Sequence, residues 1–404
     1  LICLNVFVRY KTDKNGKSVP VCKIYTAKEH PIRNTMIDRD ALWAIRKIQN
    51  AGGEAYIVGG AIRDIMLGHT PKDFDIGTSL SPRQVQRLFW NSRIIGKRFR
   101  IVHLFFGDKI IEVTTFRSDE ENFGEGNNNV WGTIEQDARR RDFSINSLYY
   151  NPQKCELLDF GRSMEDFEKK IIRSLIPLKY SFEEEPVRMI RAVKYKVTTG
   201  FSLKWDVKLA LLRNASQLQN CPASRLTEEV VKILSSGYSA DIFHTMYQYR
   251  LLQYLLPAYA VHSELPSMGE SLRILDEKVK NAMEKGLEKP GKAEMFYYMI
   301  RSAIIIDTSL SLSWNEYMKD AFRQAKVMLS PITPANFELE RAVSLLLSEK
   351  GIKATKPKKK KTQKKVSQDI ERAVNPKVKR RKPGKKSNAK PSEDKETNIE
   401  AKAE

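Results

Sequence analysis

The chain is poor in cysteine and has no long apolar run. Its four cysteines stand far apart among 404 residues and form no C-x-x-C pair, so neither a disulfide framework nor a structural zinc site is expected. This cysteine usage fits a reducing compartment, and we expect the cytoplasm. Apolar stretches fall short of the roughly 20 residues that a membrane-spanning helix needs, which predicts no membrane partner.

Metal-ligand spacing is also missing among the histidines. The five histidines are scattered, and none forms the closely spaced pair that is typical of a zinc site. We therefore expect ordinary core or surface positions for His30, His69, His103, His244 and His262.

Acidic residues are outnumbered by basic ones. Lys and Arg total 70 against 49 Asp and Glu, which gives a formal net charge of +21. Between Lys353 and Lys390, 17 basic residues face two acidic ones, and the rest of the chain is basic as well. A basic excess on both parts favours a polyanionic partner over the simpler alternative, a tail that only improves solubility.

The pattern of residues predicts five segments. They are a polar extension without a clear period, a head in which helices and strands alternate, a helical neck, a helical body, and a disordered Lys-rich tail. The tail is low in apolar residues and cannot bury a core. The expected bounds are 1–36, 37–175, 176–240, 241–350 and 351–404.

Within the head, glycine pairs and apolar runs mark the expected elements. Helices are predicted at 40–50, 61–67 and 82–90, and strands at 54–58, 73–76, 100–106 and 109–116, the last two joined by a Gly-Asp turn. Residues 118–130 are rich in Gly and Asn and read as a surface loop. After residue 182 helical periodicity dominates, for example at 187–197, 226–234 and 247–256.

The sharpest constellation is a glycine pair followed by two aspartates. Gly59-Gly60 stands between a predicted strand and a predicted helix, where the backbone can approach a phosphate closely. Arg63 lies one turn into that helix and can add a charged contact to a triphosphate. Asp73 and Asp75 are two apart on a predicted strand, so their carboxylates lie on one face and suit Mg²⁺, with Mn²⁺ as an alternative.

A third carboxylate stands in an otherwise apolar strand. Glu112 follows Ile110-Ile111, and a lone carboxylate there is costly unless it is paired or binds a metal. If this strand neighbours the strand of Asp75, the three acids converge and fit metal-assisted phosphoryl transfer. Each signal alone is weak, because turns often contain a glycine pair or D-x-D, but their combined order favours the catalytic interpretation.

These residues resemble a known family. The segment Val58–Ser79 is similar to the catalytic signature of the class II nucleotidyltransferases, in the polymerase-β superfamily, which contain the bacterial poly(A) polymerases and the CCA-adding enzymes. Further motifs follow in order, for the ribose, the hinge, the template that reads the base, and the helix that supports it. They match 137–150, 157–175, 184–195 and 224–237.

The resemblance implies an α+β fold, with a small mixed sheet and its helices as a polymerase-β-like head, before helical neck and body regions. It implies ATP as the substrate, RNA 3′ ends as the acceptor, and a helical body at 241–350 that binds RNA. We also expect a monomer. Asp73 and Asp75 would hold the metal, with Glu112 and Asp142 as further catalytic residues. The nucleotide would be bound by Gly59, Gly60, Arg63, Arg141, Asp142, Glu185, Arg188, Arg191 and Lys194.

The template motif also has a physical interpretation. Glu185 and Arg188 are three apart on one predicted helix, so they share a face and can copy a Watson–Crick edge. Arg191 and Lys194 continue that face toward the phosphates. The family usually has Glu-Asp where this chain has Glu184-Glu185. Arg225 and Glu229 are candidates for support of this helix.

Two members of the family share this head, so other segments must separate them. Ile94–Leu104, Ser147–Tyr150 and Glu29–Ile32 are closer to bacterial poly(A) polymerases, and the basic tail suits a broad RNA substrate. The sequence therefore favours template-independent addition of AMP from ATP to RNA 3′ ends. A CCA-adding or A-adding tRNA nucleotidyltransferase is the alternative. The intact acids argue against a non-catalytic RNA-binding protein. The helical body and basic tail argue against a small-molecule nucleotidyltransferase.

Overall fold

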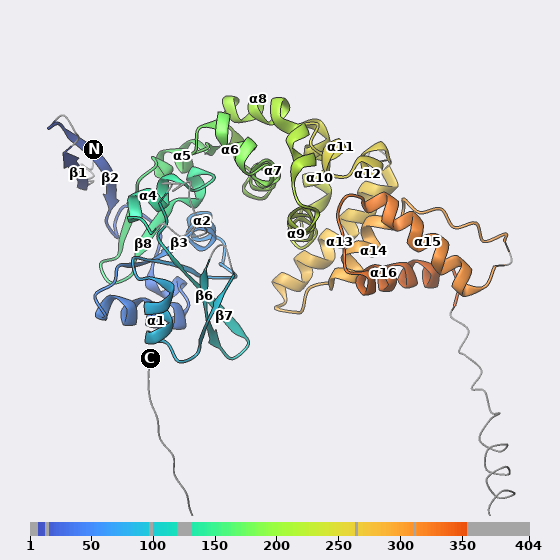
Figure 1. Ribbon diagram of the computed structural model, residues 1–404, viewed down its shortest axis with the longest axis horizontal. Coiled ribbons are helices and arrows are strands. Elements are labelled where there is room, and N and C mark those ends of the chain that lie inside the picture. Colours follow the sequence, from blue (N-terminus) through green and yellow to red (C-terminus); the bar gives the residue numbers. More distant parts are fainter. Residues whose placement is uncertain are drawn as a thin grey trace, which may run out of the picture. The chain divides into compact units, whose positions relative to one another are not determined.

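The computed structural model describes residues 7–12, 16–96, 100–118, 131–262, 266–310 and 312–353 (Figure 1). The chain divides after Lys353 into two units, and the described residues all belong to the first. The predicted disordered tail therefore lies, apart from its first three residues, outside the described residues, as does most of the predicted loop at 118–130.

Within the described residues, nine strands form one sheet in the order β1-β2-β9-β8-β3-β4-β7-β6-β5. The β4–β7 pair is parallel, and the other neighbours are antiparallel. The strands are β1 (Phe7–Thr12), β2 (Ser18–Tyr25), β3 (Ala55–Val58), β4 (Asp75–Thr78), β5 (Ser92–Ile95), β6 (Ile101–Phe106), β7 (Lys109–Thr115), β8 (Leu148–Asn151) and β9 (Glu156–Asp159).

The N-terminal segment contributes two strands that the sequence did not predict. Residues 1–36 show no clear period, yet β2 pairs with β9 and adds the β1–β2 hairpin to the edge of the sheet. Only Cys22 and Ile24 of β2 are buried, so the period-2 signal is too short to stand out in the sequence. A 3₁₀ turn (Asn34–Met36) then leads into the first helix.

Helices flank the sheet, and the first three begin within one residue of where the sequence predicts them. The α1 helix (Arg39–Asn50) starts at Asp38, whose side chain accepts hydrogen bonds from the N–H groups of residues 40 and 41. Its face Ala41, Ala44, Ile45 and Ile48 is fully buried. The remaining helices of the head are α2 (Gly60–Met66), α3 (Pro82–Leu88), α4 (Ile134–Arg139), the 3₁₀ turn Ser144–Asn146 and α5 (Ser163–Lys169).

After the sheet the chain is almost entirely helical, as Figure 1 shows from green to orange. One hydrophobic cluster runs through it from Phe143 to Leu347, and a two-stranded pair, β10 (Ile171–Ile172) with β11 (Ser202–Leu203), closes its start. The helices are α6 (Leu178–Glu184), α7 (Val187–Thr199), α8 (Trp205–Asn214), the 3₁₀ turn Ala215–Asn220, α9 (Ala223–Leu234), α10 (Ser239–Gln248), α11 (Leu252–Leu255), α12 (Pro257–His262), α13 (Pro266–Glu284), α14 (Lys292–Ile300), α15 (Trp314–Leu329) and α16 (Asn336–Glu349).

The predicted α+β head and helical remainder are confirmed, but one helix is not. The segment 247–256 was expected as a single helix, whereas α10 ends at Gln248 and α11 begins at Leu252. Arg250 between them has φ 58°, and the N–H of Leu251 bonds back to Met246. This turn buries Leu251 and Leu252 completely, which a continuous helix would not do.

None of the described helices is both long enough and apolar enough to cross a membrane.

Candidate active site

Three acidic side chains line one cavity beside the central strands. The cavity has a volume of about 1090 Å³, and Asp73, Asp75 and Glu112 all belong to its wall. Asp75 opens β4 and is paired in register with Glu112 of the parallel neighbour β7, so the strands alone bring these two acids together. Asp73 was predicted to lie on this strand, but it stands two residues before the strand begins.

The acids affect one another through charge. Burial raises the pKa of Asp75, the charges of Glu112 and Asp73 raise it further, and Arg141 lowers it, which leaves a pKa of about 6. Within the described part of the chain, no three acidic, histidine or cysteine side chains come close enough to hold an ion by themselves. Asp73, Asp75 and Glu112 therefore share one cavity, as predicted, but they do not form a closed three-ligand cluster.

The glycine pair lies against these acids. Gly59 has φ 75° and ψ −131°, a conformation that other residues rarely adopt. A Cβ there would lie 3.5 Å from Nη1 of Arg141 and 3.6 Å from Oδ2 of Asp75. The predicted order of strand, glycine pair and helix is confirmed, with Gly60 as the first residue of α2. Backbone without side chains thus faces the cavity between an acid and a guanidinium group.

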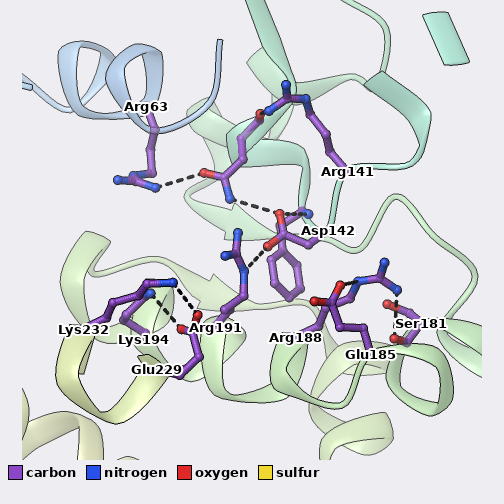
Figure 2. A network of polar contacts seen from close by, with 12 residues as sticks. Arg63, Arg141, Asp142, Ser181, Glu185, Arg188, Arg191, Lys194, Glu229 and Lys232 are labelled. Carbon is purple, nitrogen blue, oxygen red and sulfur yellow. Dashed lines mark hydrogen bonds and ion pairs between the residues drawn. The ribbon is translucent and has the colours of Figure 1, made fainter. Parts of the chain in front are cut away.

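A chain of polar contacts crosses the cavity from the head to α7 (Figure 2). Nη1 of Arg63 donates to Oδ1 of Asn146 at 3.0 Å, and Nδ2 of Asn146 donates to Oδ1 of Asp142 at 3.1 Å. Nε of Arg191 then donates to Oδ2 of Asp142 at 2.7 Å. The guanidinium groups of Arg63 and Arg191 both lie over the ring of Tyr195.

Asp142 is the buried centre of this chain. Burial opposes its charge, but Arg191 and the hydrogen bonds from Asn146 and the Phe143 N–H outweigh burial and hold the pKa of Asp142 below its ordinary value. The pKa of Arg191 is raised, by Tyr195 first and by Asp142 next. The carboxylate and the guanidinium group are therefore a fixed ion pair, and Asp142 is a positioning group for Arg191 as well as a candidate for ribose binding.

Arg141 has partners of its own, which the sequence did not predict. It lines the cavity, but its guanidinium donates to the hydroxyl of Tyr149 at 2.9 Å and to the Asn146 carbonyl at 3.2 Å, and it pairs with Asp137 at 3.3 Å. Burial by itself would raise the pKa of Asp137, but the charges of Arg141 and Arg140 outweigh burial and lower this pKa to about 2. Arg141 is thus held rigidly, with one edge toward Gly59.

The template residues meet differently from the prediction. Glu185 ends α6 and lies outside α7, so it does not share a helix with Arg188. Nε of Arg188 is still 3.4 Å from Glu185, because the chain turns at Pro186 and the Arg188 N–H bonds to the Glu185 carbonyl. Arg188 also donates to the Ser181 carbonyl (Figure 2). A further hydrogen bond runs from Arg188 to Glu184.

The α9 helix supports this wall through two ion pairs. Arg225 lies 2.6 Å from Glu185, on the side of that carboxylate away from Arg188. Glu229 is buried and receives Lys194 of α7 at 3.4 Å and Lys232 at 2.9 Å. The predicted contact of Arg225 and Glu229 with the template segment is confirmed.

All of the residues that the sequence singles out for catalysis, metal or nucleotide lie in the wall of this one cavity. The sequence missed the residues that orient them, above all Asn146, Asp137, Tyr149 and Tyr195. The first three are part of the segment 137–150 that was singled out, so only their side-chain directions were missing. Tyr195 ends the template segment, and nothing in its spacing marks it.

Comparisons with known proteins agree with this geometry. A family described as "Poly A polymerase head domain" matches residues 55–173, and one described as "Probable RNA and SrmB- binding site of polymerase A" matches residues 200–262. The Bacillus stearothermophilus CCA-adding enzyme in complex with CTP has a similar fold, with a TM-score of 0.51 at 22% identity over 78% of this chain and 83% of that one. At such identity the likeness concerns the fold.

Sequence relatives are more informative. Poly(A) polymerase I of Salmonella typhi is 31% identical over 85% of this chain and 80% of its own length. That of Escherichia coli is 35% identical over 69% of this chain, and this chain spans 63% of its length. A CCA-adding enzyme of Geobacillus thermodenitrificans is 34% identical over 54% of each chain. With the acids, the glycine pair and the template wall in one cavity, these matches show that the chain belongs to the tRNA nucleotidyltransferase/poly(A) polymerase family.

Proposed function

We propose that this cavity transfers AMP from ATP to the 3′ end of RNA without a template and releases pyrophosphate, as a poly(A) polymerase does. The observation that carries the proposal is the cavity wall itself. Two acids in strand register lie beside a glycine pair, and Arg63, Arg191 and Lys194 of the same wall offer cationic groups that suit a triphosphate.

The acids fit a divalent metal ion. The raised pKa of Asp75 reflects burial together with two neighbouring carboxylates, and this repulsion is what a dication relieves. Asp73 and Asp75 would hold Mg²⁺, or Mn²⁺, with substrate oxygens as further ligands. A bound ion would supply Lewis acidity and charge at the phosphate. Glu112 keeps a carboxylate next to Asp75 on the open side of the site.

The chain's own residues would bind and orient ATP. Gly59 and Gly60 leave room for the triphosphate next to Asp75, and Arg63 offers a guanidinium group that Asn146 and Asp64 hold in place. Arg141 and Asp142 fix the geometry around the ribose, the latter through Arg191. Glu185 would accept a hydrogen bond from the amino group of adenine, and Arg188 would donate to a ring nitrogen.

Addition of CCA or of A to tRNA is the second candidate, because CCA-adding enzymes also match the chain. Identity over most of the Salmonella poly(A) polymerase favours polyadenylation. We further propose that the protein acts as a monomer in the cytoplasm. The three described cysteines, Cys22, Cys155 and Cys221, are free thiols, which suits a reducing compartment.

One experiment separates the candidates. The purified chain is given a generic oligoribonucleotide or a tRNA that lacks its CCA end, each with ATP or CTP and Mg²⁺. Long A-tails on the generic RNA are expected, and none with the Asp73→Ala variant, which should still bind RNA. Addition of C and then A, restricted to tRNA, would overturn polyadenylation.

A further inference from the structure

A row of side chains crosses the sheet through the catalytic acids. The strand registers place Val58 opposite Asp75, Asp75 opposite Glu112, Glu112 opposite His103 and His103 opposite Arg93. Residues opposite one another in neighbouring strands point to the same face. The row therefore runs from β3, next to the glycine pair, through the acids on β4 and β7, to the edge strand β5.

Beyond Glu112 this face of the sheet is open to solvent. Phe105 and Ile110 are directly opposite each other on β6 and β7, and their exposed fractions are 39% and 43%. Ile95 of β5 is also exposed, at 39%. The other face of the same strands is buried, with Val102 and Leu104 in the core of the head. The described residues thus leave an aromatic and aliphatic surface uncovered immediately beside the acids.

This open face is physically connected to the site. Nε2 of His103 lies 3.5 Å from Oε1 of Glu112, and the rings of His103 and Phe105 meet edge to face with centroids 6.3 Å apart. Arg93 stands at the far end of the row and is exposed. Within the described chain, no hydrogen bond or ion pair joins the side chain of Arg93 to another residue. We call Phe105, Ile110, Ile95 and Arg93 the β-face.

The direction of the reaction decides what the β-face receives. In phosphoryl transfer the attacking hydroxyl and the leaving pyrophosphate lie on opposite sides of the reacting phosphorus. The residues suited to ATP, Gly59 and Arg141 among them, lie on the β3 side of Asp75. The acceptor must then approach from the other side, past Glu112, where the β-face lies.

The chemistry of the β-face matches single-stranded RNA. An exposed aromatic ring stacks on any base, and an unpaired arginine binds a backbone phosphate. Aliphatic side chains around the ring exclude water from a stacked base. We propose that the β-face binds the 3′-terminal nucleotides of the acceptor RNA, with Phe105 against a base and Arg93 on the phosphate behind it.

This inference rests on the proposed function and adds a reason for a sequence feature. The segment Ile94–Leu104, which is closer to poly(A) polymerases than to CCA-adding enzymes, contributes half of β5 and four of the six residues of β6, and it runs along the chain from Arg93 to Phe105. On this proposal, the segment lies beside the 3′ end of the bound acceptor RNA. A surface that stacks any base suits an enzyme that extends many RNAs.

The test is a steady-state assay of AMP addition to a labelled oligoribonucleotide. Phe105→Ala is expected to raise KM for the RNA about tenfold and to change KM for ATP less than about twofold. Phe105→Tyr should restore KM for the RNA, because it keeps the stacking ring. Arg93→Ala should raise KM for the RNA and reduce its dependence on salt concentration.

Matched controls lie at the opposite edge of the same sheet. Phe7 and Arg9 of β1 are exposed like their counterparts, and Phe7→Ala and Arg9→Ala should leave both KM values unchanged. If the wild-type chain adds no AMP to RNA, the proposed function fails. If it adds AMP but Phe105→Ala binds RNA as the wild type does, the β-face proposal fails and the function stands.

Discussion

At the scale of single residues, burial and neighbouring charges move the pKa values of acids in this site away from their ordinary values. Asp75 is the clearest example, because its pKa is raised to about 6 by burial, Glu112 and Asp73. A carboxyl group with a raised folded pKa stabilises the fold fully below its unfolded value near 3.8 and loses that contribution as the pH rises through 6. Without metal, the ionised carboxylate of Asp75 should therefore lower the free energy of unfolding at a pH above 6.

We predict that Asp75→Asn stabilises the metal-free protein at pH 8 by up to about 3 kcal/mol and has little effect at pH 4. It should also abolish AMP addition. Urea denaturation in the presence of a chelator, repeated from pH 4 to pH 8, measures the difference. Mg²⁺ should raise the melting temperature of the wild type more than that of the variant. Parallel pH curves for the two proteins would contradict the raised pKa.

Asp142 gives a second prediction at this scale, because its charge is buried and balanced by Arg191. Arg191→Met leaves that charge without its main partner and should lower the free energy of unfolding by about 3 kcal/mol. Adding Asp142→Asn should recover part of the loss, since the unpaired charge disappears. Urea denaturation of the wild type, both single variants and the double variant measures the coupling. Simple additivity of the two losses would show that the pair is not coupled.

At the scale of elements, the junction between α6 and α7 forms the wall expected to read the base. Arg188 is fixed there by the Ser181 carbonyl, Glu184 and Glu185, so its guanidinium group is oriented before a nucleotide arrives. Of the two glutamates, Glu185 lines the cavity and Glu184 is the more exposed partner. This division makes one glutamate a test residue and the other its control.

We predict that Arg188→Ala and Glu185→Gln each lower kcat/KM for ATP by about tenfold to a hundredfold and bring the ratio of ATP to CTP use nearer to one. Glu184→Gln should change this ratio by less than about twofold, because it leaves the cavity wall intact. Single-nucleotide addition with each triphosphate measures the ratio. A Glu184→Gln variant that shifts selectivity as strongly would place the reading group elsewhere.

Elements also show where local signals were enough. The α1 helix was predictable because a helical apolar stripe is followed by a glycine pair, and the β6–β7 hairpin because a Gly-Asp turn separates two strand-like runs. The α10–α11 break was not, because its apolar pattern also fits one helix. The β1–β2 hairpin was missed for the opposite reason, since it contributes few buried residues.

For the whole molecule, the chain divides after Lys353 into two units, and most of the Lys-rich segment belongs to the second. Ile352 still packs against the helical core, so the natural place to truncate is after Lys353. Lys and Arg clusters gain RNA affinity mainly by releasing counterions from phosphates. Their removal should therefore act on RNA binding and leave the folded unit alone.

We predict that deletion of residues 354–404 weakens binding to a generic oligoribonucleotide and makes the logarithm of the affinity fall less steeply with the logarithm of salt concentration. The melting temperature should change by less than about 2 °C, because the buried core residues of the described chain all precede Lys353. Fluorescence anisotropy across a salt series and a thermal melt measure the two quantities. An unchanged salt slope would show that the segment makes no phosphate contacts.

The sequence by itself determined which residue types meet in this protein. Spacing along a strand or helix fixed the glycine pair, the acids and the basic residues of α7, and a resemblance supplied their order, so the α+β fold and the list of cavity residues were predictable. Only the tertiary structure decided how they meet. Strand register placed Glu112 between Asp75 and His103, and a turn at Pro186, not a shared helix, brought Glu185 to Arg188. Register and chain turns depend on contacts between distant segments, which local patterns do not encode.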